Sequence, residues 1–87
     1  MMKEIVIGTV SVAKNGMAYL APSDGYYSFC LGRKLSETVS DGTRAVAVIK
    51  EKEDGRLWAD AVFEVNIAHS LEHVVERAEQ WVERHRW

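Results

Sequence analysis

Cysteine, proline and long apolar runs are all scarce in this sequence of 87 residues. Its one cysteine, Cys30, has no partner for an internal disulfide, which favours a reducing compartment such as the cytoplasm. No apolar run approaches the roughly 20 residues that a membrane-spanning helix needs, and the N-terminus is too short and too interrupted for a signal peptide. We therefore expect one soluble cytoplasmic domain, residues 1–87, with no membrane contact.

Patterns that carry catalysis or bind metal are also missing from the sequence. His69 and His73 are four residues apart, a spacing that can place two imidazoles on one helix face, but no cysteine lies nearby and the glutamate of the zinc-helix motif is lacking. Asp24, Asp41 and Asp54 each precede a glycine, which is typical of turns. No nucleophile–base pair or phosphate-binding loop is found. The sequence thus predicts no enzyme activity, no metal site and no cofactor.

Charge is almost balanced overall but unevenly distributed. The formal net charge is −2 at pH 7, yet residues 1–35 carry an excess of basic side chains and residues 36–87 are acidic. A local basic patch matters more for nucleic-acid binding than the total charge does. Lys14, Arg33 and Lys34 are therefore candidate phosphate contacts, and the alternative is that they form an ordinary solvated rim.

Residues 8–31 contain the clearest β-sheet pattern. Asn-Gly at residues 15–16 and Asp-Gly at residues 24–25 supply the backbone angles that two-residue hairpin turns need. These turns predict a meander of three strands. The three strands are expected at residues 4–13, 17–21 and 26–31.

Aromatic and sulfur-containing side chains alternate along the second and third of these strands. Met17 and Tyr19 are two apart, as are Tyr27 and Phe29. Alternation by two places such residues on one face of a sheet, and a flat aromatic face can stack unpaired bases. The alternative is that some of the four are ordinary core residues or cross-strand pairs.

The second half of the sequence predicts two more strands. Residues 32–42 are irregular apart from one helical turn, which the spacing of Leu35 and Val39 allows. An Asp-Gly turn then joins strands at residues 44–53 and 56–66. On the second of these strands, alternation places five apolar residues on one face: Leu57, Ala59, Ala61, Phe63 and Val65.

Residues 69–87 change to helical spacing, and Ser70 is a suitable N-cap. Five strands followed by one helix predict a mainly β fold, a small Greek-key barrel at residues 4–66 with a C-terminal α-helix. We expect the helix to cross one open end of the barrel through Leu71, Val75, Ala78 and Trp81. The predicted barrel core contains Val10, Val12, Leu20, Val48 and Phe63.

Several motifs resemble the cold-shock type of OB-fold, and most closely the N-terminal OB domains of ribonuclease II/R exoribonucleases. They span residues 6–66 and comprise Gly8–Val10, Asn15–Leu20, Pro22–Gly25, Phe29 and Asp41–Val48. The resemblance implies a five-stranded OB-like barrel that binds single-stranded nucleic acid. Met17 replaces the first aromatic of the family's second strand, whereas Tyr19 keeps the second. No nuclease domain is included, so the resemblance implies no phosphodiesterase activity.

Two functions are therefore predicted. In the first, a stand-alone OB-like module binds single-stranded nucleic acid, with RNA favoured. Its site residues would be Lys14, Met17, Tyr19, Tyr27, Phe29, Arg33 and Lys34. In the alternative, a degenerate acidic barrel docks on a larger protein, inhibits it, or mimics nucleic acid. The partner-binding residues would then be Trp58, Trp81 and Trp87.

Overall fold

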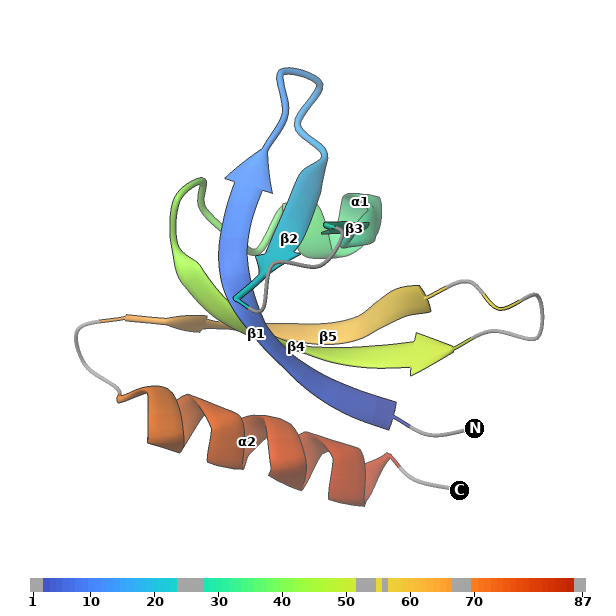
Figure 1. The fold of residues 1–87 in the computed structure, drawn as a ribbon, viewed down its shortest axis with the longest axis vertical. Coiled ribbons are helices and arrows are strands. Elements are labelled where there is room, and N and C mark those ends of the chain that lie inside the picture. Colours follow the sequence, from blue (N-terminus) through green and yellow to red (C-terminus); the bar gives the residue numbers. More distant parts are fainter. Residues whose placement is uncertain (1–2, 24–27, 52–54, 56, 67–69, 86–87) are drawn as a thin grey trace.

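Five antiparallel strands form one sheet that curls into a half-barrel, with a helix on its outer face (Figure 1). The computed structural model describes residues 3–23, 28–51, 55, 57–66 and 70–85. The strand order across the sheet is β3-β2-β1-β4-β5. The predicted mainly β class, five strands with a C-terminal helix, is confirmed. The elements are β1 (Lys3–Val12), β2 (Ala18–Pro22), β3 (Phe29–Cys30), α1 (Gly32–Ser36), β4 (Arg44–Glu51), β5 (Leu57–Val65) and α2 (Leu71–Arg84).

The strands lie close to their predicted positions, and the differences fall at the turns. Gly16 has a φ of 86°, which confirms the left-handed turn between β1 and β2. β2 pairs with β3 as expected, but the Asp-Gly turn at residues 24–25 and Tyr27 lie outside the described residues. The helical turn allowed after residue 31 is present as α1. Both β3 and α1 contact β5, so they partly close the open side of the half-barrel.

The sheet has a core on each face, because its outer face is covered by α2. The inner core contains Val10 and Leu20, and Val12 packs against it. The outer core contains Val48, and Phe63 packs against it. The prediction of one core holding all five residues was therefore wrong. β4 takes part in both cores, and the run Ala45–Ile49 is buried throughout.

A register shift in β5 explains a second difference from the predicted pattern. Val48 pairs with Ala61, whereas the next residue, Ile49, pairs with Ala59, so Asp60 is the extra residue of a β-bulge. Ala59 then packs in the inner core and Ala61 in the outer core. The predicted single apolar face along this strand was wrong because the bulge reverses the alternation.

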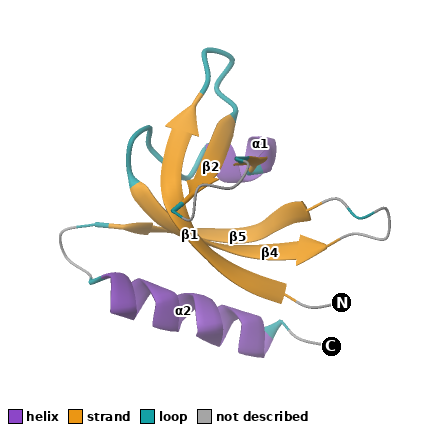
Figure 2. Cartoon of the chain, in the orientation of Figure 1, coloured by secondary structure: helices purple, strands orange, loops and turns teal. Residues whose placement is uncertain are grey.

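Helix α2 lies along the outer face of β1, β4 and β5 (Figure 2). The prediction that it crosses an open end of the barrel was wrong. The Ser70 side chain accepts a hydrogen bond from the His73 backbone N–H at 3.2 Å, which confirms the N-cap. Val74 and Ala78 are fully buried against the sheet, and Trp81 is half-buried. No helix in the described part of the chain is long and apolar enough to span a membrane.

Candidate functional site

Tyr19 and Phe29, two members of the predicted stacking face, lie on opposite faces of the sheet. Tyr19 pairs with Cys30, and Leu20 pairs with Phe29. Directly opposed residues in an antiparallel pair point to the same face, so Phe29 shares the inner face with the buried Leu20. Phe29 packs against the inner core. The prediction of one shared aromatic face was therefore wrong, because the register of this hairpin pairs odd-numbered residues with even-numbered ones.

Tyr19 lies instead on the outer face of β1, β2 and β3. Its neighbours across the strands are Ser11 and Cys30, both of them exposed. The Cys30 thiol is free and exposed on this face. Its Sγ accepts a hydrogen bond from the Gly32 N–H at 3.3 Å, which links this face to the start of α1. Tyr19 is half-buried, so part of its ring is available on this surface.

The β1–β2 turn is held by a local hydrogen-bond pattern. The Asn15 side-chain Oδ1 accepts from the Met17 N–H at 3.0 Å, and the Ala13 N–H donates to the Met17 carbonyl at 2.9 Å. Gly16 has no clash in its left-handed conformation, and an added Cβ would meet no atom within 4 Å. Met17 is the residue before β2, which begins at Ala18, so its side chain extends from the turn and not from the strand.

Ser36, on the last turn of α1, joins this helix to β2. Its hydroxyl oxygen accepts from the Ala18 N–H at 2.8 Å, and the hydroxyl donates to the Gly32 carbonyl. The Met17 Sδ is 3.7 Å from the same oxygen. Ser36 is the buried polar residue of this region, at 8% exposure. The β1–β2 turn and α1 are thus fixed side by side, although neither could be placed against the other from the sequence.

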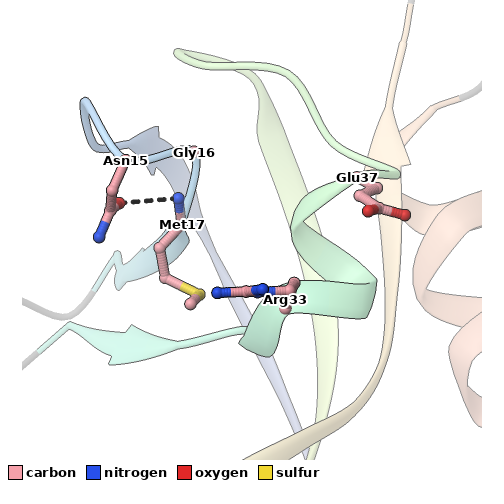
Figure 3. Close-up of a pocket in the computed structure, with 5 residues that line it drawn as sticks. All are labelled: Asn15, Gly16, Met17, Arg33 and Glu37. Carbon is pink, nitrogen blue, oxygen red and sulfur yellow. Dashed lines mark hydrogen bonds between the residues drawn. The ribbon is translucent and has the colours of Figure 1, made fainter.

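A shallow pocket of about 330 Å³ lies between that turn and α1. Figure 3 shows the Met17 thioether extending toward the guanidinium of Arg33 across this space. Both residues were predicted to belong to the site. Sequence reasoning missed Glu37, and a helix assigned at residues 32–36 would have placed it one turn after Arg33. The pocket is lined by Asn15, Gly16, Met17, Arg33 and Glu37.

The remaining predicted residues are distributed over several surfaces. Lys14 and Lys34 are both exposed. In the sequence they are the immediate neighbours of the pocket residues Asn15 and Arg33. Trp58 is 41% exposed on β5. Trp81 stacks on the His85 ring with centroids 4.0 Å apart, and Trp87 and Tyr27 lie outside the described residues.

Asp41 has a structural role that fits its predicted place in a turn. Its Oδ1 accepts a hydrogen bond from the Val12 N–H at 2.8 Å, which ties the turn before β4 to the end of β1. Among the described residues, no group of three His, Cys, Asp or Glu side chains is placed to hold a metal ion. His69 lies outside this part of the chain.

Comparisons with known proteins do not assign the chain to a family. No family model matches it, and neither a curated protein nor a solved structure matches.

Proposed function

We propose that this protein binds single-stranded nucleic acid through a surface made by the β1–β2 turn, Tyr19 and α1. We call it the turn–helix surface, and its residues are Lys14, Asn15, Met17, Tyr19, Arg33 and Lys34. The observation that carries the proposal is the pocket between Met17 and Arg33, which brings two predicted site residues from distant segments together. The cold-shock resemblance of residues 6–66 supports the same ligand.

The chemistry of this surface suits a single strand better than a duplex. Exposed Lys14, Arg33 and Lys34 supply positive charge for phosphates, and the Tyr19 ring supplies a stacking surface on the adjoining face. With Phe29 in the inner core, fewer rings are available than the sequence predicted. We therefore expect modest affinity that depends strongly on salt, because the phosphate contacts supply much of the binding energy.

A fluorescence-anisotropy titration tests the proposal. Labelled single-stranded RNA and DNA of about ten nucleotides, a length that small barrels can cover, are titrated at low and moderate salt. Lys34→Ala should weaken binding to all sequences alike and reduce the salt dependence. Arg84→Ala, an equal charge change at an exposed side chain of α2, is the matched control. Absence of binding by the unmodified protein at low salt would contradict the proposal.

The exposure of Trp58 favours protein binding as a second candidate. Tryptophan is enriched at interface hot spots, and an exposed one is uncommon on a surface without a partner. Because Ala59 packs in the inner core, alternation directs Trp58 to the outer face, which also carries α2. A pull-down from the host with the unmodified protein and with Trp58→Ser tests this candidate. A partner retained by the first and lost by the second would support it.

A further inference from the structure

Arg33 and Glu37 carry opposite charges, and both line the pocket without pairing with each other. In Figure 3 the Arg33 guanidinium lies near Met17, and Glu37 lies at the other end of α1. They are one helical turn apart, a spacing that allows an ion pair on a helix surface. In the described part of the chain, no ion pair joins them, and both side chains are exposed. The order of the two residues is part of the reason, since a basic residue four positions before an acidic one on a helix pairs more weakly than the reverse order. A guanidinium and a carboxylate therefore remain available to a ligand in the pocket.

The size and lining of the pocket define what that ligand can be. A volume of about 330 Å³ is at the low end for small-molecule sites, which is enough for one planar base. Met17 supplies an apolar, polarizable wall that suits the face of a ring. The Asn15 Oδ1 accepts a hydrogen bond from the Met17 N–H, and this bond holds the Asn15 side chain at the rim of the pocket. Gly16 adds no side chain to the rim.

We propose that this pocket binds a guanine base, an inference that rests on the proposed nucleic-acid function. Guanine has two acceptors, N7 and O6, on one edge, and arginine binds that edge with two hydrogen bonds. Its adjacent edge has the N1–H and N2–H donors, which a carboxylate can accept together. Adenine and cytosine lack the imino donor beside an amino group, and uracil lacks the amino group. Arg33 and Glu37 thus match both edges of guanine and of no other common base.

Substituted bases test the two contacts separately. Labelled oligouridine of about ten nucleotides, with one central guanosine, is compared with the same strand carrying adenosine, inosine or 7-deazaguanosine. The unmodified protein should bind the guanosine strand about tenfold more tightly than the adenosine strand. Inosine lacks the 2-amino group that Glu37 would accept from, and 7-deazaguanosine lacks the N7 that Arg33 would donate to. Each should lose a part of the preference.

Variants should remove one discrimination each. Glu37→Met should abolish the preference for guanosine over inosine, because methionine has no oxygen to accept from the 2-amino group. Arg33→Met should abolish the preference for guanosine over 7-deazaguanosine. Both side chains are exposed, so the thermal unfolding of these variants should match that of the unmodified protein. Glu79→Gln on α2 makes the same charge change away from the pocket and should leave every preference unchanged.

The outcomes separate this inference from the proposed function. If the strands bind with equal affinity whichever central base they carry, the guanine pocket is overturned and the nucleic-acid function stands. Titration with free guanosine monophosphate provides the complementary arm. If the mononucleotide binds and none of the labelled strands does, the guanine pocket is supported and the nucleic-acid function is overturned. No binding of any probe would overturn both.

Discussion

Leu20 and Phe29 lie directly opposite each other across the β2–β3 pair, and both face the inner core. Tyr19, one residue earlier, points to the other face and pairs with Cys30. A ring expected to stack on a ligand is therefore part of what holds the half-barrel together. Phe29 therefore contributes to the stability of the domain, whereas Tyr19 belongs to the proposed binding surface.

Phe29→Ala should destabilise the protein by about 2 kcal/mol. Large-to-small changes of fully buried aromatics cost about 3–5 kcal/mol, and Phe29 is half-buried against the inner core. Chemical denaturation measures the change in the free energy of unfolding. Tyr19→Ala is the matched variant on the outer face, and it should reduce single-strand affinity by the equivalent of about 1–3 kcal/mol with a smaller loss of stability. Equal losses of stability in both variants would contradict the assigned faces.

Gly8→Ala should destabilise the fold by about 3 kcal/mol. A Cβ on Gly8 would lie 2.9 Å from the Ala21 carbonyl carbon and 3.0 Å from the Leu20 Cγ, and its nearest contact would be the Ala21 carbonyl oxygen. These are largely backbone atoms of the paired strand β2, which cannot move without disturbing the ladder. Thermal unfolding measures the effect.

Gly42→Ala is the control for Gly8, because its cost is conformational rather than steric. Gly42 has a φ of 82°, and an added Cβ would meet no atom within 4 Å. The expected cost is about 1–2 kcal/mol. A Gly8 variant that is no less stable than the Gly42 variant would rule out the close approach of β2.

Ser36→Ala should destabilise the domain by about 1–3 kcal/mol. The Ala18 N–H, which donates to the Ser36 hydroxyl at 2.8 Å, would lose its acceptor in a buried position. The same change releases α1 from β2, so nucleic-acid affinity should fall as well. Thr38→Ala is the control, because the exposed Thr38 hydroxyl also donates to a helix carbonyl, that of Leu35. Urea unfolding in which both variants lose the same stability would argue against the Ser36 link.

Trp81→Ala should destabilise the protein by about 3 kcal/mol, because Trp81 packs against the outer core between α2 and the sheet. His85→Ala removes the ring stacked on Trp81 at 4.0 Å together with the hydrogen bond between His85 Nδ1 and the Trp81 carbonyl at 2.8 Å, and it should cost about 1 kcal/mol. Differential scanning calorimetry measures both. An unchanged transition for Trp81→Ala would mean that this side chain serves a partner instead of the sheet.

Local patterns predicted most of the elements correctly. Alternation gave the first, second, fourth and fifth strands close to their observed bounds, and Ser70 correctly predicted the start of α2. These features depend on neighbouring residues, so the sequence carries them directly. The sequence also predicted Met17 and Arg33 as site residues, but through separate arguments about aromatic alternation and charge. It gave no reason to expect that they share a pocket.

The inaccurate predictions all concern which residues face one another. Three features decide the face on which a side chain lies. They are the β2–β3 register, which pairs odd-numbered with even-numbered residues, the bulge at Asp60, and the packing of α2 on the outer face of the sheet. A register change of one residue moves every side chain of a strand to the other face, and several registers satisfy the same alternating pattern. Local pattern therefore leaves the face undecided.

The sequence by itself determined the order and type of the elements in this protein, because hydrophobic period, turn residues and caps act over a few neighbouring positions. Only the tertiary structure decided that the sheet has a core on each face, that Phe29 lies inside, and that Arg33 and Glu37 share a pocket with Met17. Those features arise from contacts between distant segments. The curl of the sheet and the buried Ser36 hydrogen bonds select among the arrangements that the local pattern allows.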